Sequence, residues 1–181
     1  MSNTASKKTL VLMIFVFVIP VVLAKLALDH DWFTRGATNN GTLLQPTINL
    51  STALEGSQPK WRLLFALPET CDEICENALF SINQVWLALG KESDRAEALV
   101  LYTPNSDKMA LQKLSAYANV HTLSVDDAIL SQLETHSVYI VDTLNNAMLF
   151  YSMDSDRKNA VMESRNMLAD IKKLLKLSRI G

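Results

Sequence analysis

A continuous apolar segment that runs directly into a cysteine pair is the feature that most constrains the fold of this chain. Residues 61–67 read WRLLFAL, and Cys71 and Cys75 follow after a short turn, at what reads as the start of a helix. A strand with so few polar residues is typical of a sheet that is covered on both faces. Both cysteines of the protein lie here, so the pattern predicts a strand–helix unit with its chemistry at the turn.

The residues after this turn alternate between strand and helix patterns. The predicted elements are a helix over 71–89, a strand over 96–103, a helix over 106–118, a strand over 120–123, a helix over 125–133, a hairpin of strands 137–141 and 148–152, and a helix over 159–177. The order β-α-β-α-β-β-α, with parallel strands first and a hairpin before the last helix, predicts an α/β domain of the thioredoxin-like class. That fold carries its redox site just after the first core strand, where the cysteines lie.

The N-terminal part of the chain has a different character. Residues 10–28 are apolar except for Lys25, and about 20 apolar residues suffice to span a bilayer. Lys7 and Lys8 precede this run and Asp29 follows it, so the positive-inside rule predicts a cytoplasmic N-terminus. The expected organisation is a cytoplasmic N-terminus over 1–8, a transmembrane helix over 9–28, a periplasmic tether over 29–58 and the thioredoxin-like domain over 59–181. The expected location is the inner (plasma) membrane.

The charge balance of the chain indicates which classes of partner it can bind. The net charge is −2, with 17 basic and 19 acidic residues, whereas nucleic-acid-binding proteins carry a basic face. We therefore expect no nucleic-acid partner. The last helix ends in cations, which suit the dipole of a helix C-terminus: Lys172, Lys173, Lys176 and Arg179. A solvated helix end is the simplest interpretation, and contact with anionic lipid or an acidic partner is the alternative.

The cysteine spacing is compatible with two kinds of chemistry. Residues four apart on a helix face the same way, so Cys71 and Cys75 can chelate a metal, and Cu(I) prefers soft thiolate ligands. A helix N-terminus also lowers a thiol pKa and activates the thiol for disulfide exchange. Nearby negative charges oppose thiolate formation and favour a bound cation, and four acids surround the pair: Glu69, Asp72, Glu73 and Glu76.

The proline positions weigh against a general disulfide reductase. Thioredoxin-like oxidoreductases place a cis-proline before the hairpin, but no proline of this chain lies between Pro104 and the strand at 137. A permanent structural disulfide between Cys71 and Cys75 is the third interpretation, since an oxidising compartment permits it.

The segment from Lys60 to Thr103 resembles the core of the Sco/SenC family, whose motif C-P-x-x-C-P has the same gap between its cysteines. These proteins are membrane-anchored thioredoxin-like factors that help deliver copper to cytochrome c oxidase. The resemblance implies copper as the bound metal, Cys71 and Cys75 as ligands, and a third ligand from a histidine just before a later strand, here His136. The basic C-terminal ending also resembles small proteobacterial membrane proteins associated with cytochrome oxidase.

Two departures from this family stand out. Asp72 and Glu76 replace both motif prolines, and His136 lies two residues closer to the strand-ending Asp142 than the family histidine does.

From this resemblance, the sequence predicts a Sco-like copper-delivery protein that acts with a cytochrome c oxidase subunit or other assembly factors. The alternatives are a thiol–disulfide reductase, in which the two cysteines are catalytic, and a non-catalytic scaffold. His121 is interpreted as a strand-edge residue.

Overall fold

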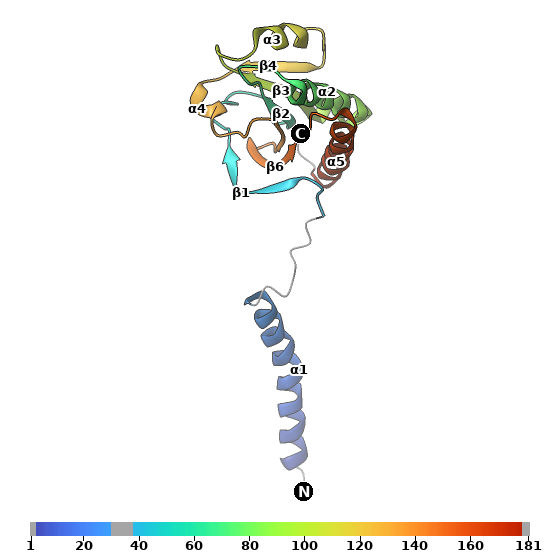
Figure 1. Cartoon of the computed structure of the whole chain (residues 1–181). Helices are drawn as coiled ribbons and strands as arrows, with labels where there is room; N and C mark the ends of the chain where they lie inside the picture. The colour runs from blue at the N-terminus through green and yellow to red at the C-terminus, as the bar shows by residue number, and fades with distance from the viewer. Residues whose placement is uncertain (1–2, 30–37, 179–181) are drawn as a thin grey trace. The chain divides into compact units, whose positions relative to one another are not determined.

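The computed structural model describes residues 3–29 and 38–178 and divides into two compact units, Met1–Thr38 and Asn39–Gly181. The first unit contains one helix, α1 (Asn3–Asp29), shown in Figure 1. Within it, Lys7–Ala27 is long and apolar enough to cross a membrane, and its side chains are exposed almost throughout. The prediction of one N-terminal helix that can span a bilayer is confirmed.

The second unit is built on a six-stranded sheet in the order β1-β6-β5-β2-β3-β4. Strands β2, β3 and β4 are parallel, whereas β5 runs antiparallel to β2, β6 to β5, and β1 to β6. The strands are β1 (Thr42–Asn49), β2 (Trp61–Ala66), β3 (Ala96–Tyr102), β4 (Val120–Ser124), β5 (Ser137–Val141) and β6 (Asn146–Ser152). This mixed sheet confirms the predicted thioredoxin-like α/β fold.

The helices connect and cover these strands. They are α2 (Glu73–Ala88), the 3₁₀ turn η1 (Gly90–Arg95), α3 (Lys108–Leu114), α4 (Asp127–Leu130) and α5 (Arg157–Leu177). Helices α2 and α5 lie side by side on one face of the sheet (Figure 1). The other face is covered by the loop that carries Leu50 and Leu54 and by the segment from Val125 to Leu133.

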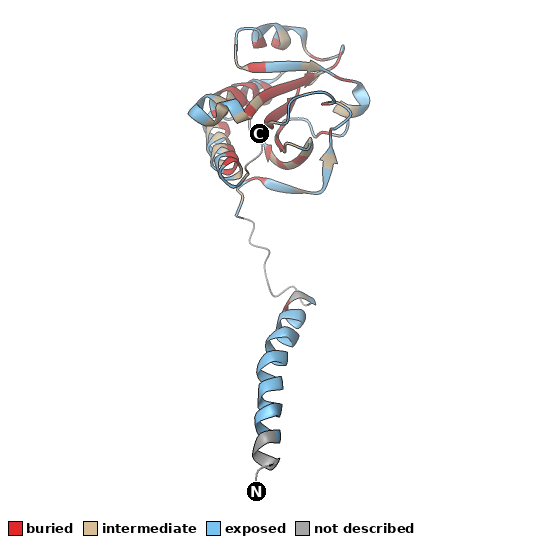
Figure 2. Cartoon of the chain, turned by 180° about the vertical axis from the view of Figure 1, so that it is seen from behind, coloured by how far each residue is buried: buried red, intermediate tan, exposed pale blue. Residues whose placement is uncertain are grey.

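Two apolar cores result, one on each face of the sheet. Every residue of β2 is buried, and Figure 2 shows the central strands as the most buried part of the unit. Leu63 and Phe65 face α2 and α5, whereas Leu64 faces the opposite core. The strand is apolar in sequence because both of its faces lose water. Its one charged residue, Arg62, is also buried, with its guanidinium donating to the Glu97 carboxylate at 2.9 Å.

The helix over 106–118 is shorter than the sequence pattern predicts. Ser106 belongs to a turn, since its hydroxyl donates to Leu67 O at 2.7 Å and accepts from Thr103 N at 3.0 Å. Helix α3 then begins at Lys108, after Asp107 caps it by accepting from Met109 N and Ala110 N. The polar side chains of the turn therefore set the start of this helix.

The domain boundary also differs from the sequence-based assignment. Residues 39–58, expected as part of a tether, belong to the compact unit, because β1 pairs with β6 and Leu50 and Leu54 are core residues. The part of the expected tether at 30–37 lies outside the described residues.

A buried carboxylate holds the start of this unit in place. Asp170 of α5 is 3% exposed and accepts hydrogen bonds from Asn40 N at 2.7 Å, Gly41 N at 2.9 Å and the Tyr151 hydroxyl at 2.7 Å. A side chain at Gly41 would collide with the Tyr151 ring. Burial, with the neighbouring Asp170 carboxylate, raises the pKa of Tyr151 far above its ordinary value of 10. We call this arrangement the Asp170 clamp.

We expect Asp170→Ala to lower the free energy of unfolding by about 3 kcal/mol, because buried donors lose their acceptor. Urea unfolding of the full chain in detergent, followed by hydrogen exchange at Asn40 and Gly41, measures this. Tyr151→Phe is the control, since it removes one hydrogen bond and should cost only about 1 kcal/mol. Equal stability of Asp170→Ala and the unaltered chain would contradict a clamping role.

Candidate functional site

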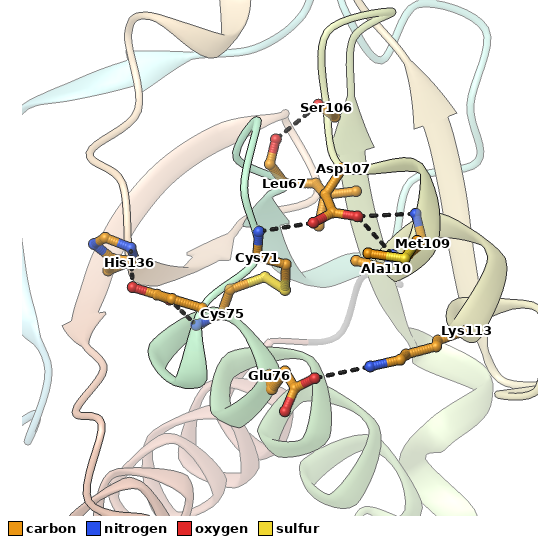
Figure 3. The surroundings of a disulfide bond; sticks show 11 residues. Leu67, Cys71, Cys75, Glu76, Ser106, Asp107, Met109, Ala110, Lys113 and His136 are labelled. Carbon is orange, nitrogen blue, oxygen red and sulfur yellow. Dashed lines mark hydrogen bonds and ion pairs between the residues drawn. A yellow bond between two sulfur atoms is a disulfide. The ribbon is translucent and has the colours of Figure 1, made fainter.

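The sheet topology brings the cysteine turn and His136 to one edge of the sheet. Strand β2 leads towards Cys71, and its neighbour β5 runs in the opposite direction, with Phe65 paired to Val138. The residues that follow β2 therefore lie beside the residue that precedes β5, which is His136. Figure 3 shows His136 on one side of the cysteine pair and Asp107 on the other.

The two cysteines form a disulfide, with their Cα atoms 5.2 Å apart. Cys71 precedes the N-cap of α2 and is partly exposed, whereas Cys75 lies in the first turn of the helix and is fully buried. Attack by a thiolate depends on access to the sulfur atom. The Cys71 sulfur is therefore the one that an incoming nucleophile reaches.

Asp72 links the helix, the buried cysteine and the histidine. One carboxylate oxygen, Oδ1, accepts from Cys75 N at 2.9 Å and so caps α2. The other, Oδ2, lies 3.3 Å from His136 Nε2. Sequence reasoning counted Asp72 only as a charge in place of a motif proline, although an aspartate directly before a helical pattern is an N-cap signal.

His136 lies where the sequence places it, directly before β5. Its φ of 65° is in the left-handed region, and its carbonyl oxygen accepts from Met153 N at 2.9 Å, which ties it to the residue after β6. Its side chain is 37% exposed. His121, in contrast, lies on the edge strand β4 and is exposed, so the structure keeps it away from β5.

The residues proposed as metal ligands are close together, but they are not arranged as a metal site in the disulfide form. Across residues 3–29 and 38–178, no group of three or more histidine, cysteine, aspartate or glutamate side chains is placed to hold a metal ion. The two sulfur atoms are bonded to each other, so a thiolate site requires reduction first. The ligand roles of Cys71, Cys75 and His136 remain predictions.

Asp107 holds the other side of the cysteine turn. Its Oδ2 accepts from Cys71 N at 3.0 Å, its Oδ1 accepts from Met109 N and Ala110 N, and its own N–H donates to Pro68 O at 2.9 Å. The hydrogen bond from Ala110 N, then that from Cys71 N, holds the pKa of Asp107 below its ordinary value of 3.8. An aspartate directly before a helical pattern is an N-cap signal, but the sequence gives no sign of the contact of Asp107 with Cys71.

The structure distributes the acids around the pair differently from the sequence expectation. Glu76 pairs with Lys113 at 2.9 Å, and this hydrogen bond raises the pKa of Lys113. Asp72 faces His136. Asp107, which the sequence did not count among these acids, places its carboxylate on Cys71 N. Negative charge therefore remains beside Cys71, where it opposes formation of a thiolate.

An open cleft of about 630 Å³ adjoins the cysteine turn. Leu67, Pro68 and Glu69 contribute to it from the β2 side, and Thr135 from the His136 side. Asn105, Asp127 and Leu130 complete part of its wall. The cleft is thus lined from both of the strand ends that carry the site.

Residues 61–178 match a family model described as transmembrane-like, thioredoxin-like, C-terminal domain. The chain belongs to this family. The match begins at the first residue of β2 and contains the disulfide, Asp107 and His136. None of the curated proteins matches the sequence.

Solved structures similar to this thioredoxin-like chain include apo Sco1 from Thermus thermophilus, at 18% identity and a TM-score of 0.53 over 77% of this chain and 99% of that one. Copper-bound ScoI from Arabidopsis thaliana has 11% identity and a TM-score of 0.48 over 74% and 98%. A secreted disulfide oxidoreductase from Mycobacterium tuberculosis has 17% identity and a TM-score of 0.42 over 68% and 94%. The likeness to Sco1 supports the shared fold.

We expect the cysteine turn to loosen in acid. Because the pKa of Asp107 is lowered in the folded state, its contribution to stability is complete above pH 3.8 and is lost as the pH falls below that value. The amide resonances of Cys71, Met109 and Ala110 should move together as the pH falls through this range, as NMR of the full chain in detergent would show. In Asp107→Asn this joint shift should vanish. Its persistence would assign the transition to another carboxylate.

Proposed function

We propose that this protein is a membrane-anchored Sco-like factor that binds one Cu(I) ion through its reduced cysteine pair and His136. It would deliver this cargo to the copper centre of cytochrome c oxidase. The observation that carries the proposal is the position of His136 beside the first turn of α2, where the two oxygens of Asp72 contact Cys75 N and His136 Nε2. Two thiolates and an imidazole form a donor set that suits copper.

The disulfide makes this site dependent on reduction. A dithiol reductant supplies two electrons and two protons, the Cys71–Cys75 bond breaks, and the reductant becomes a disulfide. Cu(I) then displaces the protons from the two thiols, since thiolates are the ligating form. The exposed Cys71 sulfur admits the reductant, and the buried Cys75 is released as the leaving thiolate.

The anchor is consistent with a location at the inner membrane. Lys7 and Lys8 precede the apolar part of α1, and Asp29 ends the helix, so the N-terminus would lie in the cytoplasm and the domain in the periplasm. The proposed partners are an oxidase subunit or other assembly factors, and no nucleic acid. The cleft beside Pro68 and Thr135 would receive the partner's segment.

A thiol–disulfide reductase that acts on oxidase-subunit cysteines is the second candidate. The unequal exposure of the two cysteine residues favours it, since exchange needs one accessible thiol and one protected thiol that resolves the mixed disulfide. If both activities are absent, the disulfide is structural.

Titration of the reduced full chain with Cu(I) against a competing chelator should show one tight equivalent. Cys71→Ser/Cys75→Ser should abolish it, and His136→Ala should weaken it by tenfold or more, because a ligand is lost. His121→Ala is the matched control and should leave the affinity unchanged, since His121 is exposed on β4. Equal Cu(I) affinity of the double serine variant and the unaltered chain would overturn the proposal.

The reductase candidate makes a different prediction. In Cys75→Ser, the accessible Cys71 should accumulate a mixed disulfide with a partner, whereas Cys71→Ser should trap far less because Cys75 is buried. Non-reducing gels of membranes followed by mass spectrometry would identify the trapped chain. Similar trapping by both variants, or by neither, would count against a reductase with Cys71 as its attacking thiol.

A further inference from the structure

The C-terminal end of α5 carries a basic cluster next to the point where the chain from α1 joins the domain. Lys172, Lys173 and Lys176 are all exposed. Asp170, two residues before Lys172, holds Asn40 and Gly41 in the Asp170 clamp. The first residues of the compact unit therefore contact the same C-terminal part of α5 that carries these three lysines. We call them the basic end of α5.

Arg95 binds one carbonyl group at the end of this helix, donating from Nη1 to Leu175 O at 3.0 Å, and it donates from Nη2 to Ser178 O at 2.7 Å. Arg95 also pairs with Glu92 at 3.1 Å. Lys172 and Lys176 line an open hollow of about 620 Å³ together with Arg95 and Glu92. The acid in this lining is therefore paired with Arg95, and the two lysines add positive charge to the hollow.

Covalent geometry keeps a bilayer within reach of this surface. The ten peptide units between Asp29 and Asn39 extend to at most about 36 Å. Juxtamembrane lysines gain free energy near an anionic lipid surface, and the gain falls off over about one Debye length, roughly 8 Å at physiological salt. The length of the connecting chain therefore permits the lysines to reach that surface.

The basic end and the disulfide lie at opposite ends of the domain. The start of α5 meets the start of α2, where Arg157 Nη1 donates to Asn77 Oδ1 at 2.7 Å. The end of α5 meets the turn that follows α2, through Arg95 and Leu175. The two helices thus run in the same direction, and the cysteines are at the start of α2. A contact at the end of α5 leaves the cysteine site open to a partner.

We propose that the basic end of α5 binds the anionic phospholipid headgroups of the membrane that holds α1. Such a contact would leave the disulfide, at the start of α2, open to a partner. The attachment of Asn40 and Gly41 to the part of α5 that carries the lysines supports this inference. It is independent of copper and of thiol exchange.

The full chain in nanodiscs provides the test. Discs of phosphatidylcholine alone are compared with discs that also contain phosphatidylglycerol, each with a trace of gadolinium-chelating lipid. Paramagnetic broadening of the amide signals of residues 172–178 is measured relative to those of the first turn of α2. We expect strong broadening at the basic end only in the anionic discs, and its loss on adding salt.

A matched pair of variants separates this surface from total charge. Lys172→Gln/Lys176→Gln should lower the ratio of membrane-bound to unbound domain by about 25-fold, because each lysine contributes a factor of about five. Lys108→Gln/Lys158→Gln removes the same charge elsewhere and should leave the ratio unchanged. Unchanged signals of the cysteine turn would show that each variant is folded. Three outcomes would overturn the proposal: broadening that does not depend on lipid charge, equal effects of the two variants, or no broadening in anionic discs. The last two outcomes would leave an acidic protein as the partner to seek.

Discussion

The central position of β2 in the sheet is the constraint on which the rest of this structure depends. It pairs parallel with β3 on one side and antiparallel with β5 on the other. Because β5 runs the opposite way, the end of β2 and the start of β5 meet at one sheet edge. The cysteine turn and His136 are neighbours for this reason, although 61 residues separate Cys75 from His136 in the sequence. Burial of β2 on both faces makes this arrangement rigid.

Two aspartates hold the cysteine turn, and one of them, Asp72, follows Cys71 directly, where the Sco/SenC motif that the sequence resembles has its first proline. Asp72 caps α2 and contacts His136, and Asp107 accepts from Cys71 N while it caps α3. A proline restricts the backbone through its ring, whereas these side chains restrict it through hydrogen bonds to amide groups. The amide contacts of Asp107 lower its pKa, so its hold on Cys71 N is lost in acid, whereas a proline ring does not respond to pH.

Charged side chains that bind backbone groups also hold the opposite end of the domain. Asp170 gathers the first residues of the compact unit onto α5, and Arg95 closes the end of that helix. The end that continues towards the membrane helix and the end that carries the disulfide are thus separated by the length of α2 and α5. The proposed lipid contact and the proposed copper site use different surfaces, so a membrane-bound domain keeps its cysteine site accessible.

Much of the fold could be predicted from the sequence because its signals are local. Hydrophobic periodicity located β2, α2 and the hairpin of β5 and β6, and the uninterrupted apolar run located α1. The closeness of Cys71 and Cys75 in the sequence identified them as one site. Two features could not be predicted in this way: the later start of α3, which polar turn residues set, and the pairing of β1 with β6. Both depend on partners elsewhere in the chain.

The sequence by itself determined an N-terminal helix that is long and apolar enough to span a membrane, the order of the main strands and helices from β2 onwards, and the position of the cysteine pair. Tertiary structure alone decided which thiol is accessible, that Asp72 and Asp107 flank the disulfide, and that Asp170 ties residues 130 positions away to α5. The physical reason is the sequence separation between the interacting residues. A hydrophobic pattern can be recognised from neighbouring residues, whereas the partner of a carboxylate is known only once the sheet has brought distant backbone amides within hydrogen-bonding distance.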